Sequence, residues 1–343
     1  MKKGTKLLMA LGMACVFASG YAQVKPTVEI GAETRMGYNR ESVDGDKLNG
    51  KSGIKGNYLN LRLDGTLNSY FSYSWRQRLN KGISDSNFFD ATDWIYLNYQ
   101  ADKHWGIAAG KQIVLIGGYE YDRAPIDVFM ASEYWNNIAC YQFGGSVTYT
   151  TSKGNDKLTA QFCESPFHND QHSDLFAYNL FWMGNHGPIS TLYSVNLMEY
   201  APKKYISYLA LGNQLSLGNA CLQLDFMNRA AAHQPYFFRD CSVMAELSCY
   251  CHPKLEVYAK ATYDVNRTDV AADLCVLPGT ELTSFGGGIN FYPLKAQKNS
   301  VRLHASAAYV TGTNGNPSGA LTDKHLRVNV GLTWKLHLLS YGK

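Results

Sequence analysis

The chain has 343 residues, of which 45% are hydrophobic, 13% aromatic and only 17% charged. Its formal charge of +4 includes three lysines before residue 7, so the rest of the chain is close to neutral and offers no electrostatic basis for binding nucleic acid. After residue 22 no apolar run approaches the roughly 20 residues that a spanning helix needs, which excludes an inner-membrane transporter.

The first residues have the pattern of a secretory leader. Lys2, Lys3 and Lys6 precede an apolar stretch over residues 7–18, and Gly20 and Ala22 supply small residues at the −3 and −1 positions of a cleavage site. A lipoprotein is the alternative, but residues 11–14 fit a lipobox poorly. The sequence therefore predicts a signal peptide over residues 1–22 and a single mature domain over residues 23–343.

From residue 28 onward, apolar and polar residues alternate in about sixteen short segments. In the last of them, Leu326, Val328 and Val330 project to one face, while Arg327 and Asn329 project to the other. This period of two indicates strands with one apolar and one polar face. The expected strands lie near residues 28–34, 59–67, 71–79, 94–99, 105–111, 141–150, 158–163, 175–183, 189–197, 205–215, 220–227, 241–251, 254–265, 283–291, 301–310 and 326–336.

The connections between these segments alternate in length. Short ones are expected at residues 68–69, 100–104, 151–156, 184–187, 216–219, 252–253 and 294–299, and longer ones at 40–55, 80–90, 113–137, 164–173, 198–204, 229–239, 267–280 and 311–324. Outer-membrane barrels have short periplasmic turns and longer external loops, and an even strand number closes a sheet without edges. The sequence therefore predicts an all-β fold, a transmembrane antiparallel β-barrel of about 16 strands in the outer membrane of a Gram-negative bacterium. A soluble β-sandwich also alternates, but it rarely contains so many segments in one domain.

The longest connection, residues 113–137, is unusual because it is apolar. Residues 113–116 are all aliphatic, Gly117 and Gly118 follow, and Phe129 and Trp135 come later in the same connection. Such a segment is poorly suited to external water. We therefore expect this third external loop to fold inward, pack on the barrel wall and narrow the lumen.

Charged residues on this loop and on the strands before it are candidates for a constriction. Five residues of the loop are charged, the acids Glu120, Asp122, Asp127 and Glu133 and the single base Arg123. Three bases lie on the expected inner face of the second and third strands, and a fourth ends the fifth strand. Charged rings in a narrow throat set ion selectivity and orient polar solutes. The residues could form an acidic loop opposite a basic wall, or be ordinary lumen charges near the rims. The predicted pore-lining set is Arg62, Arg76, Arg78, Lys111, Glu120, Asp122, Arg123 and Asp127.

Four short runs carry a family resemblance: Trp94-Ile95-Tyr96-Leu97-Asn98-Tyr99, His104-Trp105-Gly106-Ile107, Gly110-Lys111-Gln112 and Gly117-Gly118-Tyr119-Glu120. With them the chain resembles the phosphate-selective porin O and P family as found in Bacteroidetes-type bacteria, chiefly over residues 55–150. The resemblance implies a 16-stranded homotrimeric porin, surrounded by outer-membrane lipid, that passes small hydrophilic solutes or anions by diffusion. It also implies a ladder of arginines and a cluster of lysines at the throat. The acidic loop, which has no lysine, departs from that pattern.

Other functions have weaker support. An outer-membrane phospholipase would need an oriented serine and histidine, and His172-Ser173 is the nearest candidate, although adjacent strand residues point to opposite faces. His168, Asp170, His172 and Asp174 are a candidate metal group, with solvated loop residues as the alternative. No phosphate-binding glycine loop, zinc spacing or dinucleotide fingerprint is present, so we predict no catalytic residue, metal or cofactor. The remaining alternative is a non-conducting barrel that anchors surface complexes or belongs to a secretion system.

Overall fold

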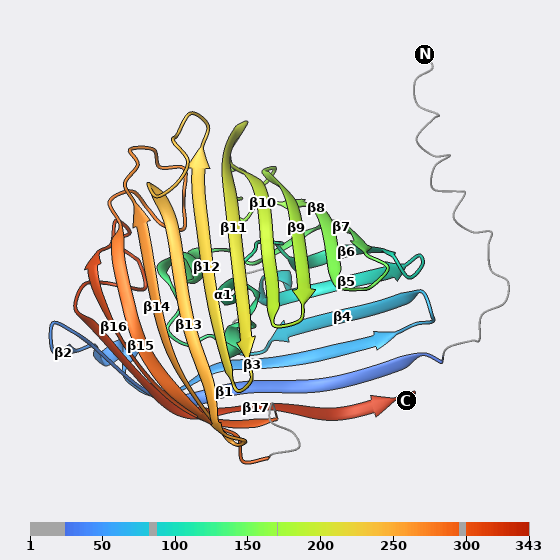
Figure 1. The fold of residues 1–343 in the computed structure, drawn as a ribbon, viewed down its shortest axis with the longest axis horizontal. Helices are drawn as coiled ribbons and strands as arrows, with labels where there is room; N and C mark the ends of the chain where they lie inside the picture. Colours follow the sequence, from blue (N-terminus) through green and yellow to red (C-terminus); the bar gives the residue numbers. More distant parts are fainter. Residues whose placement is uncertain (1–24, 82–87, 170, 295–299, 343) are drawn as a thin grey trace.

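The structure is a computed structural model that describes residues 25–81, 88–169, 171–294 and 300–342 (Figure 1). The predicted signal peptide over residues 1–22 lies outside the described residues, as does Asp170 of the candidate metal group.

The described chain forms one closed antiparallel sheet in which almost every strand pairs with its neighbours in sequence. β1 closes the sheet by pairing with β17, from Val28 opposite Tyr341 to Val43 opposite His325. The sheet counts 17 strands, and β2 has only two residues, so sixteen strands build the wall, as predicted. The strands are β1 (Thr27–Val43), β2 (Asp46–Lys47), β3 (Gly53–Thr66), β4 (Phe71–Arg78), β5 (Thr92–Gln100), β6 (Trp105–Ile113), β7 (Tyr141–Thr150), β8 (Asp156–Glu164), β9 (Phe176–His186), β10 (Ile189–Ala201), β11 (Lys204–Leu217), β12 (Ala220–Ala231), β13 (Asp240–His252), β14 (Leu255–Asn266), β15 (Glu281–Phe291), β16 (Val301–Thr313) and β17 (His325–Tyr341).

Alternation along each strand separates a polar interior from an apolar exterior. On β14, Lys260, Thr262 and Asp264 are buried inside the barrel, whereas Ala259 and Ala261 between them are exposed on its outer face. Successive strand residues point to opposite faces, so the same sequence supplies a polar lumen and a lipid-facing surface.

Helices are few and short, and none among the described residues is long and apolar enough to cross a membrane. Two short 3₁₀ turns, η1 (Asn49–Lys51) and η2 (Phe88–Ala91), lie between strands.

Most connections have nearly the predicted lengths, but three differ. The connection expected over residues 40–55 is shortened to 44–52, because β1 continues to Val43 and β3 begins at Gly53. The expected long connection over residues 198–204 is a turn of two residues, because β10 continues to Ala201 and β11 begins at Lys204. The connection expected to be short at 294–299 instead follows the end of β15 at Phe291 and extends to Val301, with residues 295–299 outside the described part.

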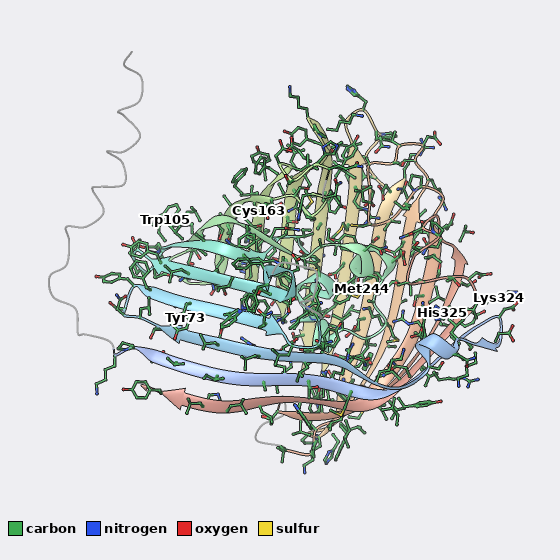
Figure 2. The ribbon with its side chains drawn as sticks, turned by 180° about the vertical axis from the view of Figure 1, so that it is seen from behind. Tyr73, Trp105, Cys163, Met244, Lys324 and His325 are labelled. Atoms are coloured by element: carbon green, nitrogen blue, oxygen red, sulfur yellow. The ribbon has the colours of Figure 1, made fainter. Side chains whose placement is uncertain are left out.

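Aromatic side chains gather near the short turns. Trp105 and Tyr149 lie with ring centroids 5.0 Å apart, and Phe71 and Tyr99 are also 5.0 Å apart. Figure 2 shows Trp105 at one end of the wall and Lys324 at the opposite end. Aromatic girdles of this kind are typical of barrel ends at the membrane interface.

Candidate pore constriction

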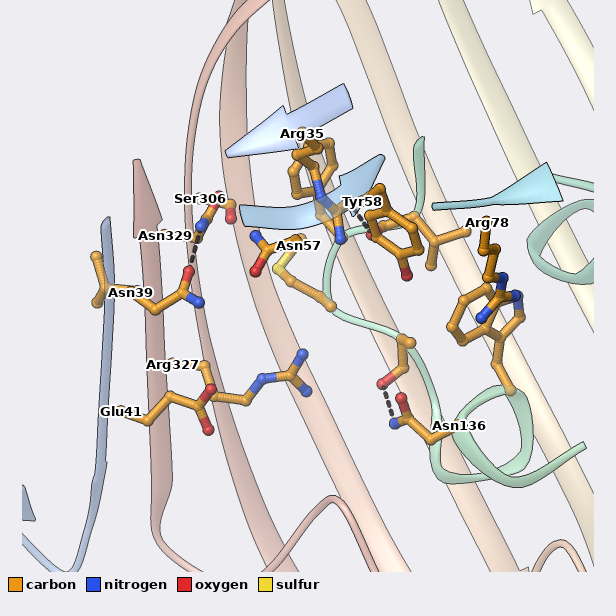
Figure 3. Close-up of a pocket in the computed structure, with 16 residues that line it drawn as sticks. Arg35, Asn39, Glu41, Asn57, Tyr58, Arg78, Asn136, Ser306, Arg327 and Asn329 are labelled. Carbon is orange, nitrogen blue, oxygen red and sulfur yellow. Dashed lines mark hydrogen bonds between the residues drawn. The ribbon is translucent and has the colours of Figure 1, made fainter. Parts of the chain in front are cut away.

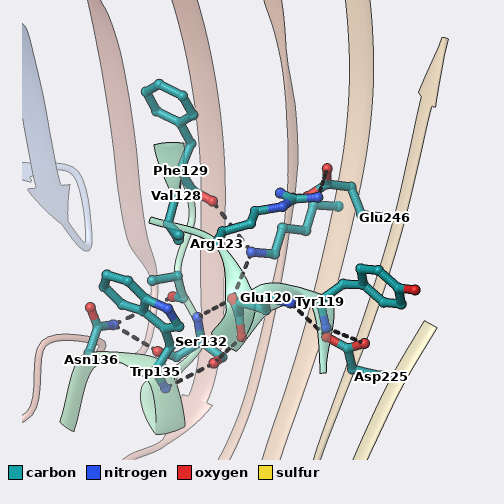
Figure 4. Close-up of polar contacts among 12 residues, drawn as sticks. Tyr119, Glu120, Arg123, Val128, Phe129, Ser132, Trp135, Asn136, Asp225 and Glu246 are labelled. Atoms are coloured by element: carbon teal, nitrogen blue, oxygen red, sulfur yellow. Dashed lines mark hydrogen bonds and ion pairs between the residues drawn. The ribbon is translucent and has the colours of Figure 1, made fainter. Parts of the chain in front are cut away.

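The connection between β6 and β7, residues 114–140, enters the barrel and lies against its inner wall (Figure 4). It contains α1 (Tyr119–Asp122), η3 (Pro125–Asp127) and α2 (Glu133–Asn137). The backbone N–H of Gly117 donates to Ser194 Oγ on β10 over 2.8 Å, and that of Glu133 donates to Asp264 Oδ2 on β14 over 2.9 Å. The third long loop is therefore folded inward, as the sequence predicted.

Burial of the loop's apolar side chains explains why it enters the lumen. They pack together with wall residues such as Met198, Ile206 and Met227 in one cluster. Burying a side chain of this size contributes about 1.5–3 kcal/mol, so the cluster is a large driving force for docking. The buried loop residues of this cluster are Val114, Ile116, Tyr121, Tyr134 and Ile138.

Glycines allow the loop backbone to touch the wall backbone. A Cβ on Gly212 of β11 would lie 2.7 Å from the Cα of Gly118, and a Cβ on Gly117 would lie 2.5 Å from the carbonyl oxygen of Leu192. Gly118 also has φ of 109°, a conformation that side chains disfavour. The Gly117-Gly118 pair thus allows the loop backbone to lie directly against the barrel backbone.

Two carboxylates hold α1 from opposite sides. Asp225 on β12 accepts the backbone N–H groups of Tyr119 and Glu120 over 2.9 and 2.8 Å. The Glu120 carboxylate accepts from Lys260 Nζ and from Ser132 Oγ, each over 2.6 Å. Burial favours the neutral acid, but the Lys260 ammonium and the Ser132 bonds hold the pKa of Glu120 below its ordinary value.

Two further charged loop residues, Arg123 and Asp127, are also paired with the wall. Arg123 donates to both carboxylate oxygens of Glu246 on β13, over 2.8 and 2.6 Å. Asp127 accepts from Arg302 on β16 over 3.0 Å and from Lys335 on β17. These pairs join the loop to β13, β16 and β17, so the structure does not bring Glu120 or Asp127 to the bases named from sequence.

Those bases lie on β3, β4 and β6. Arg76 is only 2% exposed and donates to Asp93 and to the hydroxyl of Tyr141, both over 2.7 Å, with its guanidinium 4.0 Å from the Trp94 ring centroid. Arg78 donates to the same Asp93 over 2.6 Å, but its side chain remains 32% exposed. Arg76 is therefore built into the wall, while Arg78 keeps donors for the lumen.

Arg62 and Lys111 also have partners. Arg62 donates to Glu33 over 3.2 Å and to Asp64 over 3.1 Å, so two carboxylates surround it. Lys111 Nζ donates to the carbonyl oxygen of Phe89 over 2.6 Å and keeps its charge without a carboxylate partner among the described residues.

Asp122 is the loop carboxylate that stays exposed in the lumen. It lines a cavity of about 430 Å³ together with Arg76, Trp94 and Tyr141. Here a predicted loop acid and a predicted wall base line the same cavity.

A second cavity, of about 420 Å³, lies between the loop and the wall strands β1, β3, β4 and β17 (Figure 3). Three guanidinium groups line it, those of Arg35, Arg78 and Arg327, and Glu41 is the one acid in its lining. Glu41 is itself 2.9 Å from Nε2 of His325. The cavity therefore contains more positive than negative charge.

Arg35 is held by neutral partners. Its Nη1 donates to the carbonyl oxygens of Ile126 and Val128, over 3.0 and 2.9 Å. Its guanidinium lies 4.7 Å from the Tyr58 ring centroid and 4.8 Å from that of Phe129. Carbonyls and rings orient the group without cancelling its charge.

Arg327 forms no hydrogen bond or ion pair with any residue of the described part of the chain. Sequence reasoning placed it on the polar face of the last strand but left it out of the site, because alternation alone does not say how far along the barrel a residue lies. Arg35 was missed for the same reason, although it shares its face of β1 with Glu33, which bonds to Arg62.

The lumen continues beyond this cavity. A neighbouring cavity of about 650 Å³ shares Tyr58, Arg78, Trp135 and Asn136 with it, and adds Lys111 to the lining. The two cavities therefore adjoin across Arg78.

One residue of the candidate metal group, His168, lines the 650 Å³ cavity with Arg78 and Lys111. His168 Nδ1 is 2.8 Å from the carbonyl oxygen of Ser165 in the loop after β8. Among the described residues, which omit Asp170, no group of three His, Cys, Asp or Glu side chains is arranged to hold a metal ion.

Comparisons with known proteins agree with this architecture. The sequence profile of the family described as Phosphate-selective porin O and P matches residues 28–220, more than half of the chain. A search of curated protein sequences found no significant match.

Solved porin structures superimpose over most of the chain. An anion-selective porin from Comamonas acidovorans has a TM-score of 0.64 at 14% identity, covering 91% of this chain and 100% of that one. A trimer form of OmpT from Vibrio cholerae has a TM-score of 0.62 at 13% identity, covering 91% and 100%. The outer-membrane channel DcaP of Acinetobacter baumannii has a TM-score of 0.62 at 13% identity, covering 93% and 100%. At these identities the likeness shows the fold alone.

Proposed function

The chain belongs to the phosphate-selective porin O and P family, and on that premise we propose that its pore prefers small oxyanions of the phosphate class over cations. As a member of this family it is an outer-membrane porin, not an enzyme, and it passes small solutes. What needs a proposal is which solutes it favours and which residues select them.

The observation that supports anion preference is the excess of positive charge in the cavity of Figure 3, where three guanidinium groups face the single carboxylate of Glu41. Arg35 and Arg327 have no carboxylate partner within the described chain, whereas Glu120 and Asp127 of the loop are each paired with a wall cation. A unit charge about 4 Å from a permeating ion contributes on the order of 1 kcal/mol even at the dielectric constant of water. Two such cations in one cavity would bias the pore toward anions, less so at high salt.

The pore-lining set named from sequence enters this proposal with unequal roles. Arg78 would act with Arg35 and Arg327 at the selective cavity, and Lys111 would contribute to the adjoining one. Asp122 and Arg76 would give a local transverse field, while the remaining members would act mainly by holding the loop and wall. Those remaining members are Arg62, Glu120, Arg123 and Asp127.

Processing and assembly complete the proposal. We propose that residues 1–22 are removed by cleavage after Ala22, that the mature protein forms a homotrimer, and that it comes from a Bacteroidetes-type bacterium. The trimer form of the Vibrio cholerae porin supports the second point by fold analogy. Amino-terminal sequencing that begins at Gln23, and a trimer mass in mild detergent, are the expected results.

The selectivity proposal is tested by the reversal potential of Arg327→Gln in a planar bilayer under a KCl gradient. Because Arg327 has no partner in the described chain, the variant should fold normally and lose anion preference roughly fivefold, the ratio that about 1 kcal/mol represents. Arg327→Glu should shift the potential further in the same direction. The control is Lys103→Gln, a charge removed from a short turn between β5 and β6. An unchanged potential in Arg327→Glu would contradict the proposal.

A further inference from the structure

The loop between β12 and β13, residues 232–239, lies on the outside of the barrel wall. Its aromatic residues Tyr236, Phe237 and Phe238 are here called the aromatic flap. The Phe238 ring centroid is 5.8 Å from that of Phe226 on β12, and the Tyr236 hydroxyl bonds to Ser207 Oγ on β11. The flap is thus attached to two wall strands instead of extending away from them.

The strand register establishes that these contacts are on the outer face. Tyr208 and Arg229 are paired across β11 and β12, and both are buried inside the barrel, where the guanidinium lies 6.0 Å from the ring. The neighbouring residues Asn228 and Ala230 must therefore point outward. They are nevertheless only 0% and 2% exposed, so the loop covers them.

The flap holds its aromatic side chains toward the surroundings at a conformational cost. Tyr236, Phe237 and Phe238 are 53%, 49% and 70% exposed. Phe237 and Phe238 have φ of 73° and 63°, a region that bulky residues rarely adopt. Beneath them, both amide atoms of Asn228 lack a partner among the described residues. The three exposed rings thus form an apolar surface that no described part of the chain covers.

Unpaired cations flank the flap. Lys203, Lys204 and Arg239, here called the basic rim, are exposed and form no ion pair within the described chain. Because Ile206 pairs with Ala231, the two-residue turn before β11 lies beside the start of the flap loop, and Arg239 ends that loop. Aromatic surface and positive charge therefore meet at the long-loop end of β10–β13.

We propose that the aromatic flap and the basic rim form a binding site for a phosphorylated glycolipid of the outer leaflet. Aromatic rings suit the boundary between acyl chains and headgroups, and exposed lysine and arginine attract anionic headgroups. A water-soluble anion would leave the flap exposed, and a neutral lipid would leave the cations unpaired, so an anionic amphiphile matches both. The long-loop end of such barrels faces the cell exterior, where this leaflet lies. The proposal does not depend on the ion selectivity of the lumen.

The first test uses the unaltered full-length mature protein. Nanodiscs of zwitterionic phosphatidylcholine are doped with bisphosphorylated lipid A or with the same lipid after dephosphorylation, and native mass spectrometry counts the lipids that remain on the barrel. The site predicts retained adducts with the phosphorylated lipid and at least tenfold fewer with the dephosphorylated one. Equal retention of the two lipids would overturn the proposal.

The second test separates the two halves of the site. Removing the basic rim should weaken lipid A retention roughly fivefold for each cation lost at low ionic strength, and removing the flap should shorten lipid residence. The variants are Lys203→Gln/Lys204→Gln/Arg239→Gln and Tyr236→Ala/Phe237→Ala/Phe238→Ala. The control for the basic rim removes three exposed cations at the opposite end of the barrel, Lys103→Gln/Lys153→Gln/Lys157→Gln. The control for the aromatic flap removes three rings from another part of the outer wall, Phe285→Ala/Phe291→Ala/Tyr309→Ala.

Folding is verified in each variant by an unchanged single-channel conductance, because the site lies outside the lumen. Controls that lose as much lipid as the variants would overturn the proposal. So would a flap variant that keeps its lipid and loses its oligomeric state, since the flap would then be an interface between copies of the chain.

Discussion

Removing the cation that faces Glu120 should release the inserted loop without unfolding the barrel. In the Lys260→Gln variant the buried Glu120 carboxylate loses a partner at 2.6 Å, where the Lys260 side chain is 1% exposed and that of Glu120 is 7% exposed. Leaving one member of a buried ion pair alone typically costs about 3–5 kcal/mol. Since about 1.4 kcal/mol corresponds to a factor of ten, the lower figure raises the population of undocked loop by roughly a hundredfold.

Hydrogen exchange reports this directly. The backbone N–H groups of Tyr119 and Glu120 are protected by bonds to Asp225, so they exchange only when the loop leaves the wall. We expect their exchange to accelerate by about a hundredfold in Lys260→Gln, while amides in the β1–β17 pairing are unaffected. The double variant Lys260→Met/Glu120→Gln should recover most of the protection, because no charge is then left unpaired.

Lys111→Gln is the matched control, since Lys111 donates to the carbonyl oxygen of Phe89, which lies outside the inserted loop. Less than a fivefold acceleration in Lys260→Gln would refute the argument that this pair holds the loop. An equal acceleration throughout the barrel would refute it as well, because the loop would then not be a separate unit.

Three further predictions concern the loop and wall. Gly212→Ala should displace the loop and raise single-channel conductance, because its Cβ would lie 2.7 Å from Gly118 Cα, whereas Gly145→Ala, with its nearest atom at 3.6 Å, should not. The pKa of Glu120 lies below its ordinary value, so its pairing stabilises the loop above the ordinary carboxyl range and is lost as pH falls through the lowered pKa. The protection of the loop amides against exchange should therefore decrease as the solution is acidified. Arg76→Gln should lower the thermal unfolding temperature of the barrel, because Arg76 is buried and paired. For the same reason it should change the reversal potential less than Arg327→Gln does. A larger change in the potential would show that Arg76 acts on permeating ions.

Much of the fold follows from local pattern. Alternation over residues 254–265 and 326–336 predicted β14 and β17 and identified their inner faces, because the period of two is set by strand geometry alone. The apolar residues 113–116 predicted that the third long loop would enter the lumen, because apolar surface is costly to leave in water.

The pairing of charges could not be predicted from local pattern. Glu120 meets Lys260, and Asp127 meets Arg302 and Lys335, more than a hundred positions away in sequence. Those partners depend on which strands the loop contacts and on where along the barrel axis it contacts them. Both are determined by how the barrel closes. For the same reason, alternation predicted that Arg76 lies on the inner face, but it could not predict that Arg76 is buried in an ion pair with Asp93.

The length predicted from the sequence for the connection after β10 was also wrong. Residues 198–204 contain no break in strand propensity strong enough to locate the ends, and the pairing of Glu199 with Tyr205 carries both strands to the turn. Pro202 and Lys203 indicated where the turn lies, but the regular alternation of short and long connections favoured a longer loop here.

The most direct test of an anion-preferring pore is the single-channel reversal potential of the purified protein in a planar bilayer under a KCl gradient, followed by addition of phosphate. The guanidinium groups of Arg35 and Arg327, which have no carboxylate partner in the described chain, predict steady conductance and a reversal potential whose sign indicates chloride preference. They also predict that phosphate reduces the chloride current once it enters the cavity. A potential that indicates cation preference, or conductance that phosphate does not change, would contradict the account.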